Sequence, residues 1–394
     1  MAPAIEPANF DKRYFMKKVL LATAALAALA AVPAKADEPA LQLGLGGYIS
    51  GYAVYNDQDG PTGTEYRNFD FRKDTEVHLS GEVALDNGIT AGAHLEMLND
   101  RNDDSAVEES YLYLSSSWGR VNLGEEDGIA YLIQVAPPTA DDKIDGPRPD
   151  ISSVNIPALS SASTGTGLGA TTLDYAQDPF GYTNKFTYIT PVFNGFQAGF
   201  SYTPSASEGD LGGTAAAAVS NSGDDFEDGM EFAARYEGSF DAIDVAIGAG
   251  YSTASLENEA ASATFTDDLK EWNAGVNIGY GAFGLGAAYV TSNNGFSNNG
   301  DMDGWVVGAD YVTGPYKVGV SYTDVDLETA AAGLVDTGMT DDVNISRWTA
   351  GGIYEWGPGM TFRGAVSYYD LDTDQAGDSE DNATQVTLGT QLTF

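Results

Sequence analysis

The stretch EVHLSGEVALDNGITAGAHLEM, residues Glu76 to Met97, decides the fold. Apolar and polar residues alternate up to Leu85, pause at residues 86–88 and alternate again from Ile89. Alternation with period two on both sides of a turn that contains Asn-Gly is typical of a β-hairpin with one apolar and one polar face. The larger residues of the apolar face are Val77, Leu79, Val83, Leu85, Ile89, Leu95 and Met97.

The alternation also predicts the register of this hairpin. Residues that lie opposite each other on paired strands share a face of the sheet, so their numbers must add to an even sum. We therefore place Leu85 opposite Ile89 and close the hairpin with residues 86–88, with Gly88 at a positive φ. On the polar face this register sets Ser80 opposite His94 and His78 opposite Glu96.

The N-terminal segment has the layout of an export signal. Lys17 and Lys18 precede an apolar run over residues 19–32, which is followed by the small-x-small site at residues 34–36. This is the pattern of a secretory signal peptide, and the run is too short to span a bilayer. We predict residues 1–36 as an N-terminal extension and signal, and residues 37–394 as the mature folded domain.

Composition narrows the class of protein. The formal net charge is −40, which argues against nucleic acid as a partner. The chain has no cysteine, so disulfides and thiolate chemistry are excluded. No long apolar run follows the signal, which excludes a helical membrane protein. A membrane β-barrel is compatible, because only every second residue of its strands faces lipid.

Hairpins like the first recur along the chain. Further short turns lie near residues 117–119, 194–195, 239–241, 281–282, 314–315 and 357–359, and longer polar stretches separate the hairpins. Counting gives about sixteen strands with short turns at one end and long acidic loops at the other, the pattern of a transmembrane antiparallel β-barrel. A soluble sandwich or propeller explains the alternation but not the one-sided loop lengths.

Four stretches carry a family resemblance: EVHLSGEVALDNGITAGAHLE, EESYLYLSSSWGRVNLGEED, YITPVFNGFQAGFSYTP and the terminal QLTF. In this order they make the mature chain similar to general diffusion porins of Gram-negative bacteria, of the α-proteobacterial type. The resemblance implies a sixteen-stranded homotrimer in the outer membrane, with a constriction loop folded into the lumen after the fifth strand. It also implies that the barrel assembly machinery recognises the terminal aromatic, Phe394.

The alternation stops over residues 125–183, where the family carries its constriction loop. A structureless loop this long is usually functional, and a barrel of this width would otherwise enclose an open channel. We predict that the charged part, DDKIDGPRPD, forms the narrowest point; a solvated loop surface is the alternative. The candidate constriction residues are Asp141, Asp142, Asp145, Asp150, Lys143 and Arg148.

Alternation also predicts which polar side chains face the lumen. The candidates for the pore wall are Arg72, His78, Glu82, His94, Glu96, Arg235, Lys317, Arg347 and Arg363. We expect the basic members to be spread around the barrel rather than clustered, so we do not expect a dense arginine ladder opposite the loop. Carboxylates that line a pore attract cations, and we therefore predict cation preference.

Two groups of polar residues suggest other chemistries, hydrolysis and calcium binding. Ser80, His94 and Glu82 have the residue types of a hydrolase triad, but no oxyanion hole is identifiable, so we expect no enzyme. Asp370, Asp372 and Asp374 begin like an EF-hand loop, but Gln375 stands where Gly is needed. Such loops are candidates only for weak Ca²⁺ binding beside anionic lipopolysaccharide, with plain solvated loops as the alternative. No other cofactor is expected.

The sequence thus predicts an outer-membrane porin for passive diffusion of small hydrophilic solutes and ions. Two alternatives stay open: a structural or adhesive barrel with a plugged lumen, and a substrate-specific channel.

Overall fold

The structure is a computed structural model that describes residues 41–58, 66–98, 107–152, 154, 173–206, 226–258, 262, 264–328, 342–373 and 381–394. Residues 39–394 form one compact unit. The predicted signal, residues 1–36, lies outside the described residues. No helix in the described part of the chain is long and apolar enough to cross a membrane.

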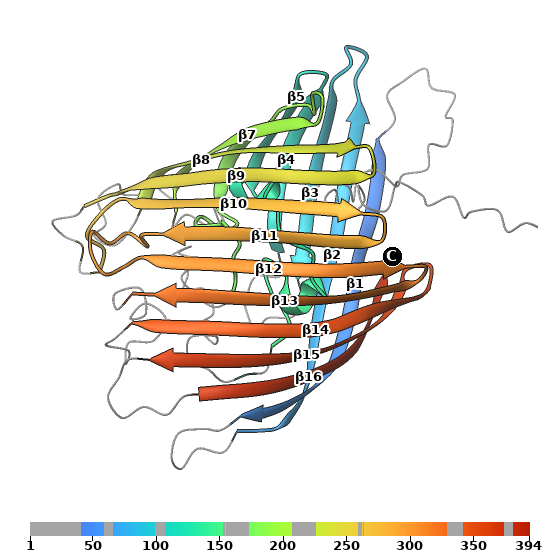
Figure 1. Ribbon diagram of the computed structural model, residues 1–394. Helices are drawn as coiled ribbons and strands as arrows, with labels where there is room; N and C mark the ends of the chain where they lie inside the picture. Colours follow the sequence, from blue (N-terminus) through green and yellow to red (C-terminus); the bar gives the residue numbers. More distant parts are fainter. Residues whose placement is uncertain are drawn as a thin grey trace, which may run out of the picture. The chain divides into compact units, whose positions relative to one another are not determined.

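Sixteen strands form one closed antiparallel barrel, in which each strand pairs with its neighbours in sequence (Figure 1). This confirms the predicted fold class. The strands are β1 (Gln42–Gln58), β2 (Phe69–Ala84), β3 (Thr90–Leu98), β4 (Val107–Ser116), β5 (Gly119–Glu125), β6 (Asn184–Ile189), β7 (Phe196–Ser205), β8 (Phe226–Phe240), β9 (Ile243–Leu256), β10 (Leu269–Tyr280), β11 (Phe283–Ser292), β12 (Met302–Thr313), β13 (Tyr316–Leu327), β14 (Val343–Gly357), β15 (Met360–Thr373) and β16 (Asp381–Thr393).

The two ends of the sheet close on each other. β1 pairs with β16 from Tyr48 opposite Thr393 to Gln58 opposite Ala383. Beyond the last ladder pair, the Gly47 amide donates to the Phe394 carbonyl at 3.1 Å, and the Phe394 amide donates back at 3.0 Å. In lipid no water can satisfy an open sheet edge, so this closure is what allows the strands to cross a membrane.

The opening hairpin has the predicted register. Ser80 lies opposite His94 and His78 opposite Glu96. The Leu85 amide donates to the Ile89 carbonyl at 2.8 Å, which closes the three-residue loop. Gly88 takes a φ of 79°, a left-handed value that favours glycine.

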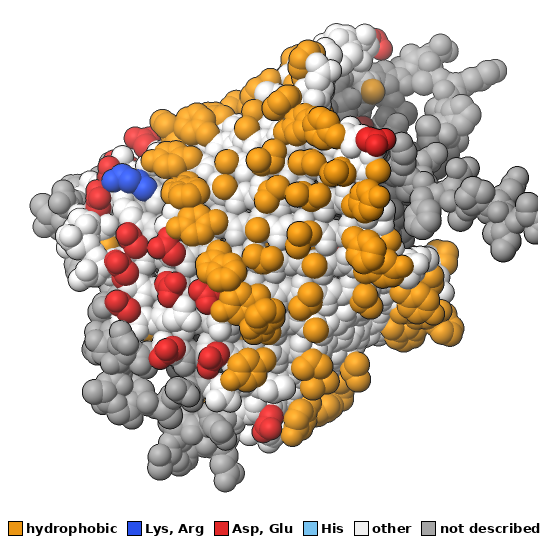
Figure 2. Space-filling model, in the orientation of Figure 1, with side chains coloured by type: hydrophobic (Ala, Val, Ile, Leu, Met, Phe, Trp, Pro, Cys, Tyr) orange, Lys and Arg blue, Asp and Glu red, His pale blue; other side chains and the backbone are white. Residues whose placement is uncertain are grey.

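Side chains alternate between the two faces of the barrel. On β14, Trp348 is 54% exposed on the outer face, whereas its neighbour Arg347 is 2% exposed and points inward. On β5, Leu123 is 53% exposed and Asn122 is 3% exposed. Figure 2 shows the result on one outer face, where hydrophobic side chains form a broad band and acidic side chains gather at one end of it.

The face assignment can be tested with single cysteines, since the chain contains none of its own. We expect Leu79→Cys and Val83→Cys to resist a membrane-impermeant thiol reagent, because the apolar face is covered by lipid or by a neighbouring subunit. His78→Cys and Glu82→Cys should react, because the polar face meets water in the lumen. The measurement is labelling of the protein in liposomes. The opposite pattern would reverse the two faces.

Candidate functional site

The described residues between β5 and β6, 126–152, 154 and 173–183, lie inside the ring of strands (Figure 1). This is the segment predicted to fold inward. Its described residues include two single-turn helices, α2 (Ile129–Leu132) and α3 (Asp142–Asp145), which the sequence did not predict. Four residues form one helical turn, too short for a helical period to show in the sequence.

Glycines on the inner wall let the loop backbone lie directly against the strands. A Cβ added to Gly275 of β10 would stand 1.8 Å from the carbonyl oxygen of Val135. One added to Gly308 of β12 would stand 2.0 Å from the carbonyl oxygen of Pro138. No side chain fits at such separations, so these wall positions need glycine for the loop to follow its path.

Polar side chains of the wall hold the same stretch of the loop. Asn277 Nδ2 donates to the Ala136 carbonyl at 2.5 Å, and Arg347 Nη1 donates to the Ile144 carbonyl at 2.9 Å. These bonds satisfy carbonyl groups that would otherwise be buried without partners, which fixes the loop on the barrel wall.

Two carboxylates at α3, those of its N-cap residue Asp141 and of Asp145, face the wall rather than the water. Asp141 is fully buried and meets Arg363 Nη1 at 2.5 Å, and Asp142 meets the same nitrogen at 3.3 Å. Asp145 is also fully buried and accepts a hydrogen bond from the Ser321 hydroxyl. Burial raises the pKa of Asp141 to about 6, although Arg363 acts to lower it. Asp141 and Asp145 therefore anchor the loop to the wall, and their place at the constriction stays a prediction.

Two other loop cations each join two carboxylates. Lys143 Nζ lies 3.0 Å from Asp74 of β2 and 2.9 Å from Asp150, so it links the loop to the first hairpin of the barrel. Arg148 Nη2 lies 3.0 Å from Asp127 and pairs with Asp178. Because Asp127 and Asp178 belong to the outgoing and returning limbs of the loop, Arg148 ties the limbs together.

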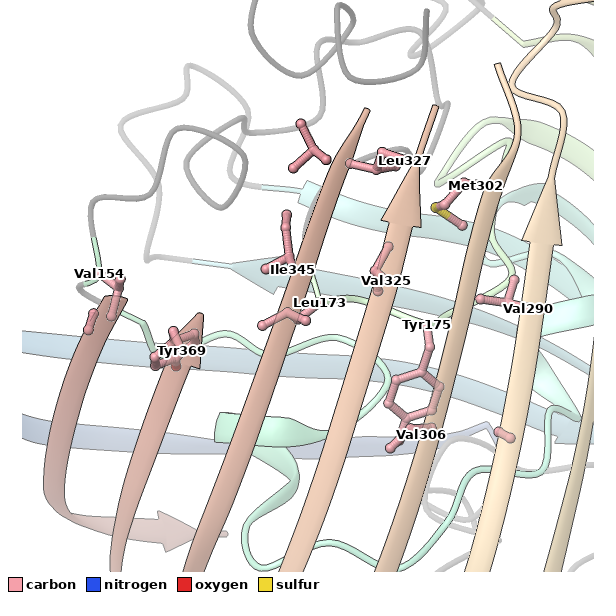
Figure 3. Packing of buried hydrophobic residues seen from close by; sticks show 13 residues of the cluster. Val154, Leu173, Tyr175, Val290, Met302, Val306, Val325, Leu327, Ile345 and Tyr369 are labelled. Carbon is pink, nitrogen blue, oxygen red and sulfur yellow. The ribbon is translucent and has the colours of Figure 1, made fainter. Parts of the chain in front are cut away.

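The returning limb packs on the inner wall with apolar side chains. Figure 3 shows Leu173 and Tyr175 of this limb among wall residues such as Val306, Ile345 and Tyr369, all buried in one cluster. These apolar wall side chains lie on β12, β14 and β15, and their packing supplements the hydrogen bonds and ion pairs that hold the loop.

The predicted wall cations divide into two groups. Arg363 and Arg347 contact the loop as described, and Lys317 lies on the adjacent strand β13, 3.9 Å from Asp310. Arg235 pairs with Glu237 at 3.5 Å, and Arg72 pairs with Asp70 at 3.3 Å. The sequence predicts wall cations spread around the barrel rather than clustered; in the structure three of the five lie on the consecutive strands β13, β14 and β15.

The remaining predicted wall residues, His78, Glu82, His94 and Glu96, lie on β2 and β3. Glu82 accepts a hydrogen bond from the Tyr113 hydroxyl at 2.7 Å. His78, His94 and Glu96 lie together there, with His94 Nε2 near His78 and Glu96 rather than in a triad. Arg120 is a further charged residue of this wall that was not predicted, and its guanidinium stacks 3.9 Å from the Tyr113 ring centroid. In the sequence, Arg120 and Asn122 alternate with the apolar Val121 and Leu123, and this pattern could have identified Arg120 as a wall residue.

The candidate calcium residues are only partly described. Asp370 and Asp372 lie on β15 with their side chains in the outward phase of Tyr368, and Asp374 lies outside the described residues. Asp372 is opposite Asn344 of β14.

Comparison with known proteins agrees with this architecture. A family model described as Gram-negative porin matches residues 22–375. No curated protein sequence matches the chain. The anion-selective porin from Comamonas acidovorans is 18% identical, with a TM-score of 0.59 over 90% of this chain and 100% of that one. OmpF of Salmonella typhi in complex with daunomycin is 17% identical, with a TM-score of 0.57 over 89% and 97%. OmpT of Vibrio cholerae in its trimer form is 14% identical, with a TM-score of 0.56 over 90% and 100%.

The glycine contacts predict a paired outcome. Gly275→Ala should push the loop off the wall at Val135, because the new Cβ would overlap a carbonyl oxygen at 1.8 Å. We expect a loss of stability of about 1–3 kcal/mol, the usual effect of overpacking, together with a changed single-channel conductance. Gly51→Ala is the control, since a Cβ there meets nothing within 4 Å. Equal thermal unfolding and conductance in the two variants would contradict the loop placement.

Proposed function

Because this chain belongs to the Gram-negative porin family, we propose that it forms a homotrimeric channel that passes small hydrophilic solutes and prefers cations. Family and fold make it an outer-membrane diffusion channel. The trimer is supported by the trimer form of the OmpT structure from Vibrio cholerae, which shares the fold. Ion preference has to come from this chain's own side chains. No enzymatic step is part of the proposal.

One observation carries the cation preference: three cations of the loop contact are each shared by two carboxylates. Arg363 contacts Asp141 and Asp142. Lys143 contacts Asp74 and Asp150, and Arg148 contacts Asp127 and Asp178. Each group is therefore negative overall when its carboxylates are ionised.

The difference in solvent exposure between these side chains also favours cations. The Arg363 side chain is 8% exposed, whereas the Asp142 side chain beside it is 68% exposed. The positive charge is thus covered by the loop while a negative charge meets the water of the lumen. Carboxylates at a constriction attract cations and repel anions. The anion-selective Comamonas acidovorans porin shares the fold at 18% identity, a level at which individual pore charges need not be shared.

A barrel with a plugged lumen remains the second candidate, because the loop is held so firmly inside the ring. Single-channel recording in a planar bilayer separates the two. A diffusion channel gives discrete steps that grow with salt concentration, whereas a plugged barrel gives essentially none.

Lipopolysaccharide is the proposed partner of the outer rim, with divalent cations between its anionic groups and the protein. Asp303 of β12 lies opposite Asp326 of β13, which lies opposite Asn344 of β14. Asn344 Nδ2 donates to Asp326 at 2.7 Å, and Asp372 of β15 continues the row. Figure 2 shows acidic side chains gathered beside the hydrophobic band. Such a row would repel an anionic lipid unless cations such as Ca²⁺ screen it.

Chelation tests this arrangement. Excess EDTA should lower the thermal stability of the assembled protein in lipopolysaccharide-containing bilayers, because a ligand that binds only the folded state stabilises it. Adding Ca²⁺ back should restore the melting temperature. An unchanged melting profile with chelator would count against bound divalent cations at the rim.

Selectivity is tested by reversal potentials in a salt gradient. We expect the wild type to prefer cations, with a preference that weakens as salt rises, since the Debye length is about 8 Å at physiological salt. Asp142→Asn should reduce the preference because its carboxylate is the exposed one. Asp145→Asn is the matched control and should affect stability more than selectivity.

The preference should also rise between about pH 5 and pH 8. Burial raises the pKa of Asp127 to about 7 and that of Asp141 to about 6, so negative charge accumulates over this range.

An anion-selective wild type, or an Asp142→Asn variant with unchanged reversal potential, would overturn the assignment.

A further inference from the structure

The chain has two histidines, and both lie on the inner face of β2 and β3. His78 Nδ1 lies 3.4 Å from His94 Nε2 and 3.3 Å from Glu96 Oε2. His94 Nε2 lies 3.9 Å from the same Glu96 oxygen. Three donor atoms of the types that bind transition metals thus converge from two neighbouring strands.

The geometry points to a site for a transition-metal cation of the Zn²⁺ class, bound by His78, His94 and Glu96. A triangle with sides of 3.4, 3.3 and 3.9 Å has a point about 2.1 Å from all three corners. This matches the usual Zn–N and Zn–O distances of about 2.0–2.2 Å. The three side chains therefore need almost no rearrangement to hold such an ion.

A second carboxylate prepares His78 for this role. Glu76 Oε1 lies 2.6 Å from His78 Nε2, on the side of the ring away from the triangle. A proton on Nε2, shared with Glu76, leaves the Nδ1 lone pair directed at the other two donors. Metal-binding histidines commonly have such a carboxylate partner, which fixes the tautomer and raises the basicity of the ligand.

Neighbouring groups support His94 and a fourth ligand position. The His94 ring packs against Tyr111, with ring centroids 5.1 Å apart, which restricts its orientation. Glu109 Oε2 lies 3.9 Å from His94 Nε2, near enough to bind the ion directly or through a water. Three protein ligands plus an open or water-filled position is a common arrangement for zinc.

The donor set and its exposure select the kind of ion. Imidazole nitrogen suits Zn²⁺ and its first-row neighbours, whereas Mg²⁺ and Ca²⁺ prefer oxygen ligands only. The His78 side chain is 19% exposed and the Glu96 side chain 12% exposed, so an ion in the lumen can reach the site. A bound dication would offset the carboxylates on this wall, and this consequence rests on the proposed channel function.

Direct binding tests the site without relying on conduction. Zn²⁺ is titrated calorimetrically into the assembled protein in detergent, prepared without a polyhistidine tag and in a buffer containing Mg²⁺ and Ca²⁺. We expect one saturable Zn²⁺ per chain that these two ions do not displace. His94→Gln and His78→Gln should abolish this binding, and Glu76→Gln should weaken it about 10- to 100-fold because it removes the carboxylate that orients the His78 ring.

Glu82→Gln is the matched control, because Glu82 faces the same lumen but bonds to Tyr113 outside the triangle. It should bind Zn²⁺ like the wild type. Resistance of each variant to thermal unfolding shows that it is assembled. Saturable Zn²⁺ binding that survives in the His78→Gln, His94→Gln double variant would place the ion elsewhere and overturn the proposal. The same holds if Glu82→Gln weakens the binding as much as the histidine variants do. The absence of saturable binding to the wild type would also overturn it.

Conductance supplies the functional readout. Micromolar Zn²⁺ should lower the cation conductance of the wild type and leave the conductance of the His94→Gln variant unchanged. Unchanged wild-type conductance with Zn²⁺ bound would overturn only the effect on ion flow. A protein that never conducts would instead refute the channel function, while the calorimetric result would still decide the metal site.

Discussion

Closure of the sheet between β1 and β16 is the constraint on which the rest of the structure depends. A backbone in hydrocarbon must find every hydrogen-bond partner within the protein, and the pairing of Gly47 with Phe394 supplies the last of them. Once the sheet is closed, each strand residue must face either outward or inward. The broad hydrophobic band and the polar inner wall follow directly from that division.

The enclosed space then determines what the long loop must do. A loop inside a barrel needs partners for its own backbone, and the wall provides them through Asn277 and Arg347. Glycines such as Gly275 let the loop approach closely enough to use these partners. The same contacts bury Asp141 and Asp145 and leave Asp142 exposed, so neighbouring carboxylates of one short helix divide between anchoring and facing the lumen.

Local features of the fold were predictable from the sequence, and long-range features were not. The hairpin at residues 76–97, its register and its Gly88 turn depend on period two and on turn chemistry, which neighbouring residues display. The inward loop could be located, because the alternation stops there. The burial of Asp141 could not be predicted, since its partner Arg363 lies 222 residues away and meets it only because the loop crosses the barrel. The convergence of His78, His94 and Glu96 was implicit in the correct register, but three polar residues on a lumen wall do not by themselves indicate a metal.

The separation of backbone and side-chain roles allows one architecture to carry different pore charges. The anion-selective Comamonas acidovorans porin and this chain share the barrel at 18% identity. Closure uses backbone groups, which every sequence has, so inward side chains can change without opening the sheet. In this chain the inward cations are largely occupied as loop anchors, with Arg363, Lys143 and Arg148 each held between two carboxylates. A cation held between two carboxylates leaves its group with net negative charge when both carboxylates are ionised, and the proposed cation preference rests on this excess.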